Sequence, residues 1–278
     1  MNFKNWLIRT LSGLVYVGFI VGCIFWGIIP FSILFAIIGV LAVFEFEKIC
    51  EGISERSLPC LLLDATGVVF LTLGYLIYPV FGWIIVYLCR CILELYSKNE
   101  KPIRSLALSL MTQLYIGLPL SLMTIIGEFS GMHFLLAVFL MIWINDTGAF
   151  VVGSLLGKHR LFERISPKKS WEGFFGGLGF NLLAGWLFSI CGKEFFFPFE
   201  SLSFWLFLGA IVTIFATWGD LVESLIKRSL SIKDSGHFIP GHGGILDRID
   251  SLLLVMPAVF IFLLLYLTLT SPSLFSLL

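Results

Sequence analysis

Residues 203–222 read SFWLFLGAIVTIFATWGDLV, and Asp220 is the one ionisable side chain in this stretch. A helix that crosses the hydrocarbon core of a bilayer needs about 20 mostly apolar residues, so the stretch predicts a transmembrane helix. Eight further stretches have the same character; they occupy residues 8–26, 29–48, 59–77, 80–96, 105–126, 134–156, 173–191 and 251–270. The sequence therefore predicts an all-α, polytopic integral membrane protein with about nine transmembrane helices.

The composition of the whole chain agrees with this fold class. Of 278 residues, 58% are hydrophobic and 13% are charged, and the mean hydropathy is +1.00. Because a soluble domain is about 45–50% apolar and about 25% charged, a soluble enzyme is excluded. The net charge is zero and no basic run exceeds two residues, which excludes a disordered chain and a nucleic-acid partner.

Lysine and arginine are distributed unevenly between the segments that connect the predicted helices. Seventeen of the 18 lie at the N-terminus or in every second connection, and only Lys193 lies on the other side. Because cytoplasmic loops carry an excess of these residues, the alternation predicts a cytoplasmic N-terminus and an external C-terminus. The polar, glycine-rich connections after 134–156 and after 203–222 then both face the cytoplasm.

These two connections suggest a division of the chain by chemistry. Residues 1–130 are expected to form a scaffold of transmembrane helices. Residues 131–278 are expected to form a catalytic transmembrane region, because connecting loops normally need no such concentration of polar side chains.

The densest polar segment runs from Asp220 to Asp250 and begins inside the end of a predicted helix. Ionisable groups at membrane depth cost about 2.5–3.5 kcal/mol each, so the cluster needs a compensating partner. Four of its side chains share one helix face at i, i+3, i+4 and i+7: Asp220, Glu223, Ser224 and Lys227. Two acids one turn apart, Asp247 and Asp250, begin the next helix. Carboxylates from two helix ends can hold Mg²⁺ together with substrate phosphates.

Basic residues accompany these acids and would neutralise phosphate oxygens: Lys227, Arg228, Lys233 and Arg248. The alternative is a set of ion pairs at the membrane surface that neutralise one another. Between the two acidic helix ends lies Pro240-Gly241-His242-Gly243-Gly244. Such a run lets backbone N–H groups approach a phosphate closely, although a plain turn explains the composition equally well.

Two motifs upstream also carry polar groups. Asn145-Asp146 falls within a predicted helix, where a carboxylate needs a partner or a metal; an interhelical hydrogen bond is the alternative. Lys168 and Lys169 precede a helix N-terminus that Ser170 is expected to cap, an arrangement that suits an anion. A positive-inside anchor is the alternative for the lysines.

Four glycines flank these motifs in pairs with small-xxx-small spacing: Gly153 and Gly157, and Gly173 and Gly177. This spacing predicts that the two helices pack closely.

One long motif resembles a known family signature. It comprises Ser224-Leu-Ile-Lys227-Arg228, then Lys233-Asp234-Ser-Gly236, then Ile239 through Asp250 with Gly243, Gly244, Asp247 and Arg248 at fixed places. The motif resembles the signature of the phosphatidate cytidylyltransferase (CDP-diacylglycerol synthase) family, and every signature position is filled. The Ser166–Gly173 segment and Asn145-Asp146 also look like family motifs. The resemblance covers roughly residues 140–255.

The resemblance implies a reaction in which CTP and phosphatidic acid give CDP-diacylglycerol and pyrophosphate. It also implies Mg²⁺ dependence, a homodimer among membrane lipids, and a bacterial inner-membrane location with the active site facing the cytoplasm. Asp220 and Asp247 match the family's metal-binding acids, and Asp250 is expected to orient a second cation or Arg248. Lys227 and Arg228 join the acids as expected catalytic residues. Phosphate and substrate contacts are expected from Asn145, Asp146, Lys168, Lys169, Ser224, Lys233, His242, Gly243, Gly244 and Arg248.

Two alternatives remain open from the residues. A CTP-dependent polyprenol or phytol kinase would use similar chemistry but transfer the γ-phosphoryl group. An ion-coupled transporter would use Asp146 and Asp220 as ion ligands. Transporters usually show internal repeats in two halves, whereas the polar motifs here crowd into the second half.

Overall fold

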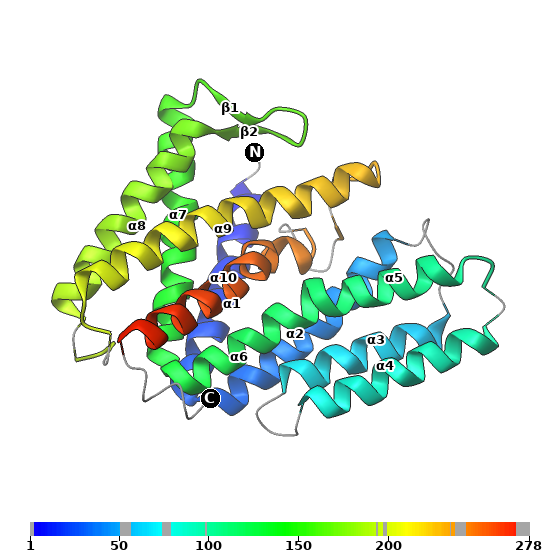
Figure 1. Ribbon diagram of the computed structural model, residues 1–278. Helices are drawn as coiled ribbons and strands as arrows, with labels where there is room; N and C mark the ends of the chain where they lie inside the picture. Colours follow the sequence, from blue (N-terminus) through cyan, green and yellow to red (C-terminus); the bar gives the residue numbers. More distant parts are fainter. Residues whose placement is uncertain are drawn as a thin grey trace.

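The chain folds into a bundle of helices with one small hairpin (Figure 1). The computed structural model describes residues 3–50, 57–73, 79–97, 99–192, 194–196, 199–233, 235–236 and 243–270, so Lys193 and His242 lie outside the described residues. The first helices are α1 (Phe3–Trp26), α2 (Ile28–Ile49), α3 (Leu58–Thr72), α4 (Pro79–Tyr96), α5 (Pro102–Thr112) and α6 (Leu118–Ser130), with the π-helical turn η1 (Gln113–Gly117) between the last two. The remaining helices are α7 (Met132–Leu156), α8 (Trp171–Cys191), α9 (Leu202–Ser229) and α10 (Leu246–Thr270).

The helices confirm the predicted all-helical fold class and are consistent with a membrane protein. Within the described residues six helical segments are long and apolar enough to cross a membrane: Ile28–Ile49, Pro102–Ser130, Met132–Leu156, Trp171–Cys191, Leu202–Ser229 and Leu246–Thr270. The apolar segments Gly13–Trp26 and Leu58–Thr72 are shorter. Nine crossings and the orientation of the N-terminus remain predictions.

A hairpin that the sequence analysis did not predict follows α7 (Figure 1). Strands β1 (Arg160–Phe162) and β2 (Ser166–Ser170) pair antiparallel beyond the ends of α7 and α8. The strands are short and mostly exposed, so they lack the apolar alternation by which a strand is recognised in sequence.

The start of α8 is fixed by two side chains. The Ser170 hydroxyl accepts a hydrogen bond from the backbone N–H of Gly173 at 3.1 Å, which confirms the predicted N-cap. The Glu172 carboxylate accepts hydrogen bonds from the backbone N–H groups of Lys158 and His159. These contacts tie the connection after α7 to the first turn of α8 and hold the hairpin between them.

Helices α7 and α8 pack closely through glycine, as the sequence predicts. A Cβ atom at Gly153 would lie 3.4 Å from the Cα atom of Gly173, and one at Gly173 would lie 2.9 Å from the carbonyl oxygen of Ala149. Larger side chains at these positions would separate the two helices.

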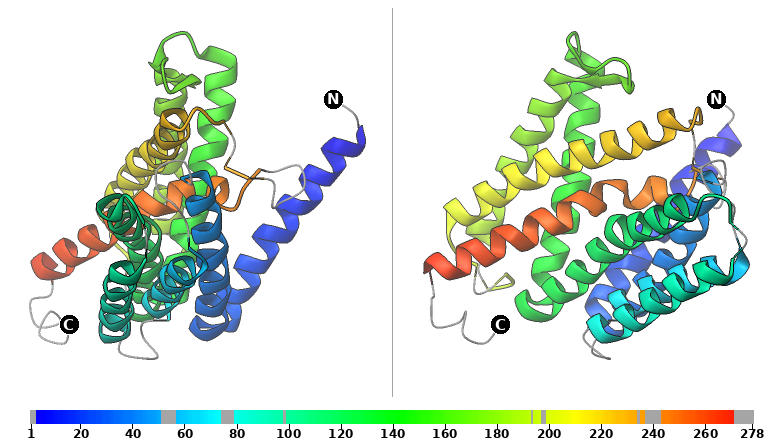
Figure 2. Two further views of the ribbon diagram at one scale, coloured as in Figure 1. Left: turned by 90° about the vertical axis from the view of Figure 1, so that its right-hand side faces the viewer. Right: turned by 45° about the vertical axis from the view of Figure 1, so that its right-hand side comes forward.

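Helix α10 joins the two halves of the chain (Figure 2). It packs along α9 on one side and against α6 and α2 on the other, while α1 packs against both α2 and α7. One continuous set of buried side chains runs through both halves, and Phe35, Phe139, Trp205 and Val255 belong to it. The predicted scaffold and catalytic region therefore share one core.

Candidate active site

Helices α9 and α10 approach each other closely at Gly219. A Cβ atom at this position would lie 2.7 Å from the carbonyl oxygen of Asp250 and 3.1 Å from the Cα atom of Ser251. Glycine permits this approach because it has no Cβ atom. The contact brings Asp220, the next residue along α9, beside Asp250 of α10.

Three acids meet at this approach. Carboxylate oxygens of Asp220, Glu223 and Asp250 lie within 4.8 Å of one another, so one cation can contact all three. Glu223 is 1% exposed, and its Oε1 atom has no hydrogen-bond partner among the described residues. A buried, unpartnered carboxylate oxygen is costly, and a hard cation is the ligand that satisfies such an atom. The donor set thus fits Mg²⁺.

Lys227 links this group of acids to Asp247. Its ammonium Nζ lies 2.7 Å from Oε2 of Glu223 and 2.5 Å from Oδ1 of Asp247. The other Asp247 oxygen, Oδ2, accepts hydrogen bonds from the backbone N–H of Gly244 at 2.8 Å and from the Ser235 hydroxyl at 2.9 Å. Asp247 therefore reaches the three acids through Lys227, and its role as a ligand of the same ion as Asp220 stays a prediction.

The glycine run before α10 is shaped by Asp247. Gly243 has φ = +81°, a conformation that L side chains rarely adopt, and a Cβ atom there would lie 2.7 Å from Oδ2 of Asp247. Pro240, Gly241 and His242 lie outside the described residues, so the turn interpretation of the whole run stays untested. Gly243 and Gly244 lie against the Asp247 carboxylate. Their predicted contact with phosphate remains a prediction.

A second lysine neutralises Asp220. The Lys169 Nζ atom, carried by β2 at the base of the hairpin, lies 2.7 Å from Oδ2 of Asp220 and donates to the carbonyl oxygen of Thr217. The Ser224 hydroxyl donates to Oδ1 of Asp220 at 3.3 Å. The structure therefore brings these two predicted substrate-binding residues to the predicted metal ligand.

The two residues of the Asn145-Asp146 motif lie in different surroundings. Asp146 lines the cavity described below, whereas the Asn145 side chain is buried against Gly177 of α8, where its Oδ1 lies against the position a Cβ would take. Asn145 thus packs against α8, but its Nδ2 donates to Asp146 on the same helix at 3.4 Å and its Oδ1 has no hydrogen-bond partner among the described residues. The interhelical hydrogen bond considered as the alternative is therefore not seen for Asn145, and its substrate contact stays a prediction.

Three predicted phosphate-binding residues lie exposed near the hairpin or after α9: Lys168, Arg228 and Lys233. The Arg228 guanidinium donates weakly to the carbonyl oxygens of Ile165 and Ile232, so it ties the hairpin to the end of α9. The exposed positions of these cations suit an electrostatic role toward an incoming anion.

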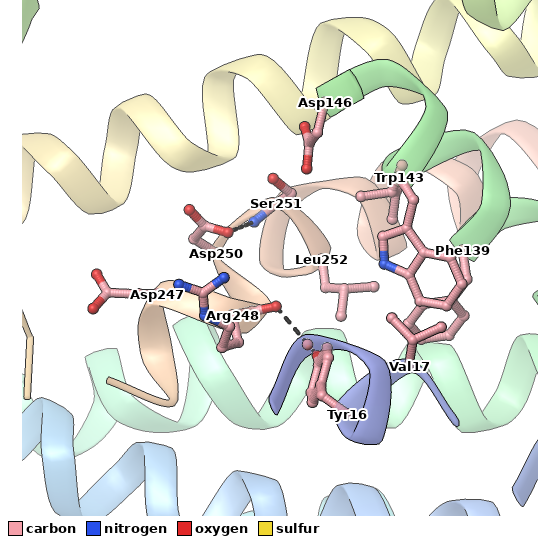
Figure 3. A pocket seen from close by; sticks show the side chains of 12 residues that line it. Tyr16, Val17, Phe139, Trp143, Asp146, Asp247, Arg248, Asp250, Ser251 and Leu252 are labelled. Atoms are coloured by element: carbon pink, nitrogen blue, oxygen red, sulfur yellow. Dashed lines mark hydrogen bonds between the residues drawn. The ribbon is translucent and has the colours of Figure 1, made fainter. Parts of the chain in front are cut away.

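A cavity of about 220 Å³ opens beside the acids (Figure 3). Its polar wall carries Asp146, Asp247, Arg248, Asp250 and Ser251, and its apolar wall carries Gly13, Val17, Phe139, Ile142, Trp143 and Leu252. The Tyr16 hydroxyl of α1 donates to the backbone carbonyl of Arg248 at 3.3 Å. Sequence reasoning missed the α1 residues because nothing in an apolar run shows which helix it will contact.

We expect Gly219→Val to lower any turnover at this site by about 100-fold, because a displacement of about 1 Å in a reacting group costs that much. The added side chain would push the Asp250 backbone away from Asp220. Steady-state kinetics of the purified variant measure the loss. Gly179→Val is the matched control, because a Cβ atom at Gly179 of α8 meets nothing within 4 Å. Equal turnover in both variants would contradict the close approach.

Comparison with known proteins shows which protein family this chain belongs to. The model of the cytidylyltransferase family matches residues 7–266. The chain belongs to the cytidylyltransferase family. The match includes Gly13, Tyr16 and Val17 of α1, which line the cavity and which the sequence motifs did not reach.

Individual relatives named as phosphatidate cytidylyltransferases align with part of this chain. It is 42% identical to the phosphatidate cytidylyltransferase of Staphylococcus haemolyticus over 163 residues, 41% identical to that of Staphylococcus saprophyticus and 40% identical to that of Staphylococcus aureus. Each alignment covers 58% of this chain and 60% of the relative.

Proposed function

We propose that the protein is a phosphatidate cytidylyltransferase, which transfers the cytidylyl group of CTP to phosphatidic acid and releases pyrophosphate. The observation that carries the proposal is the meeting of three acids and two lysines beside a cavity with one charged and one apolar wall. The names of the relatives support the choice of substrates.

The chemistry requires two anions to meet. A phosphate oxygen of the lipid forms a bond to the α-phosphorus of CTP, and the bond from that phosphorus to the bridging oxygen of pyrophosphate breaks. No nucleophilic side chain is needed, since the lipid phosphate is already ionised near neutral pH. Positioning and neutralisation of charge therefore supply most of the catalysis.

The cations of the site divide this task. Lys169 and Lys227 lie at the acids, where they hold Asp220, Glu223 and Asp247 in place. Arg248 lines the cavity, where its guanidinium would contact the phosphate of the lipid or of CTP. Exposed Lys168, Arg228 and Lys233 attract the nucleotide from solution.

Mg²⁺ is part of the proposal. Asp220 would hold it with Asp250 and Glu223, whose oxygens converge, and Asp247 is the further ligand that the family resemblance implies. When bound, the ion supplies positive charge to the phosphates and to the leaving pyrophosphate. A second cation near Asp250 belongs to the same proposal.

The mixed walls of the cavity suit a lipid. The charged wall faces the reacting phosphates, and the apolar wall from α1 and α7 accepts the glycerol end of the acyl chains (Figure 3). A nucleotide arriving from solution and a lipid arriving from the bilayer can reach this place only at the membrane rim.

The test uses the purified full chain in detergent micelles with CTP, phosphatidic acid and Mg²⁺. Release of pyrophosphate together with labelled CDP-diacylglycerol supports the proposal. Release of CDP would instead identify a CTP-dependent lipid kinase, and ion flux in vesicles without consumption of CTP would identify a transporter.

The proposal extends to topology: nine crossings, a cytoplasmic N-terminus, an active site facing the cytoplasm of a bacterial inner membrane, and a homodimer. The test places a single cysteine, Glu163→Cys, in the exposed turn of the hairpin after all six native cysteines have been replaced. We expect this cysteine to react with a membrane-impermeant maleimide in inside-out vesicles. Labelling in right-side-out vesicles instead would reverse the orientation. Chemical crosslinking measures the oligomeric state.

A further inference from the structure

A buried acid from the first half of the chain contacts the start of α10. The carboxylate of Glu45, near the end of α2, accepts hydrogen bonds at Oε2 from the backbone N–H groups of Ile245 at 2.6 Å and Leu246 at 3.1 Å. Its Oε1 atom accepts a hydrogen bond from the Ser235 hydroxyl at 2.8 Å. Glu45 is 9% exposed. The first N–H groups of a helix lack partners within the helix and carry positive partial charge, so a carboxylate stabilises them.

Two glycines of the loop before α10 are shaped by this carboxylate. A Cβ atom at Gly236 or at Gly244 would lie well inside van der Waals contact with Oε1 of Glu45. The identity of Gly244 therefore has a local cause, the approach of Glu45, besides any contact with a phosphate. Gly236 and Gly244 thus both lie against the Glu45 carboxylate.

The contacts of Glu45 continue to the acids of the site. The Ser235 hydroxyl lies 2.8 Å from Glu45 and 2.9 Å from Oδ2 of Asp247. Asp247 in turn contacts Lys227, which contacts Glu223. Since a serine hydroxyl has one hydrogen, it donates to one carboxylate at a time, and the two acids compete for it.

We propose that Glu45 is a positioning residue: it anchors the N-terminus of α10, and through Ser235 it sets the position of Asp247 for the reaction. The role of Glu45 in catalysis rests on the proposed function, because that function supplies the reaction in which Asp247 takes part. It assigns a role in the active site to α2, which the sequence analysis treated as scaffold. Glu45 does not touch the cavity, so it acts through the residues that do.

The first measurement is amide hydrogen exchange of the full chain in micelles, which needs no activity. Glu45→Ala is expected to speed exchange at Ile245 and Leu246 by about tenfold, because these amides lose their acceptor. Glu45→Gln keeps a carbonyl oxygen that can accept both N–H groups, so its exchange is expected to stay close to that of the unchanged chain. Exchange in α7 and α8 is expected to be unaffected.

The second measurement separates kcat from KM. Glu45→Ala is expected to lower kcat by about tenfold or more with the KM for CTP changed less than threefold, because displaced groups act mainly in the transition state. Glu45→Gln is expected to recover most of kcat. A merely structural role would lower the yield of folded protein and leave the kcat of the folded fraction unchanged.

The matched control is Glu163→Ala, the same change as Glu45→Ala at an exposed glutamate in the turn of the hairpin. It is expected to leave both exchange at the start of α10 and kcat unchanged. Gly244→Ala and Glu45→Ala are expected to be non-additive when combined, because both act on one contact.

Unchanged exchange at Ile245 and Leu246 in Glu45→Ala would overturn the anchoring role. Unchanged kcat in that variant, with faster exchange, would overturn the positioning role. If the unchanged chain forms no CDP-diacylglycerol, the proposed function fails, and the exchange experiment still decides whether Glu45 anchors α10.

Discussion

Asp220→Asn is expected to lower kcat by about 1,000-fold or more, because it removes a ligand that supports the charge of the transition state. Asp220 is the acid that joins Glu223, Asp250 and Lys169 at one point. Asparagine has nearly the same shape, so the variant tests charge and not packing. The measurement is CDP-diacylglycerol formation over a range of Mg²⁺ concentrations.

The same loss, about 1,000-fold, is expected for Asp247→Asn, since the carboxylate also holds Lys227 in place. Glu163→Gln, in the exposed turn of the hairpin, is the control and is expected to be fully active. Near-normal turnover of either aspartate variant would remove that residue from the proposed metal site. A binding measurement with Mn²⁺ as the probe would separate loss of the metal from loss of turnover.

Lys227→Met is expected to destabilise the protein by about 3–5 kcal/mol, the usual cost of removing one partner of a buried ion pair. Lys227 is 9% exposed and lies between the carboxylates of Glu223 and Asp247. Without the ammonium group, two carboxylates would face each other in a buried place. Thermal unfolding in micelles measures the loss, and kinetics of the folded fraction measure the expected fall in kcat.

Lys168→Met is the control for this experiment, because Lys168 is an exposed lysine of the hairpin. It is expected to leave the unfolding temperature unchanged. An unfolding temperature for Lys227→Met equal to that of the control would show that the ion pairs contribute nothing to stability.

Much of the helical structure was predictable, because long apolar runs report directly on helices that cross a membrane. The stretches 29–48, 134–156, 173–191 and 203–222 lie within α2, α7, α8 and α9, whose ends extend a few residues further. Those extensions carry chemistry: α9 continues to Ser229 and so holds Lys227 on a rigid helix. The sequence analysis ended the membrane-spanning stretch at 222, because the following residues are polar, but its shared helix face already extended to Lys227.

The candidate site was predictable only in part. Helical spacing correctly placed Asp220, Glu223 and Lys227 on one face, and the dense motif pointed to α10. What the spacing could not show was the partner of each acid. Asp220 lies beside Asp250 because Gly219 allows the backbones of α9 and α10 to approach closely. Asp247 forms an ion pair with Lys227 instead.

The contributions of α1 and α2 were not predictable by such reasoning. Tyr16 contacts a residue 232 positions away, and Glu45 contacts one 200 positions away. Periodicity describes one helix at a time and gives no pairing between distant helices. One signal was present: Glu45 lies at the end of an apolar run, where an ionisable group calls for a partner.

The contact between Glu45 and α10 has a consequence for biosynthesis. A ribosome makes α2 long before it makes the amides that Glu45 binds, since 200 residues separate Glu45 from Ile245. During that interval the carboxylate must stay hydrated or find a temporary partner, because an unpaired charge is costly in the bilayer. Synthesis of α10 therefore completes the proposed active site, and a nascent chain that stops before α10 lacks Asp247 and Asp250.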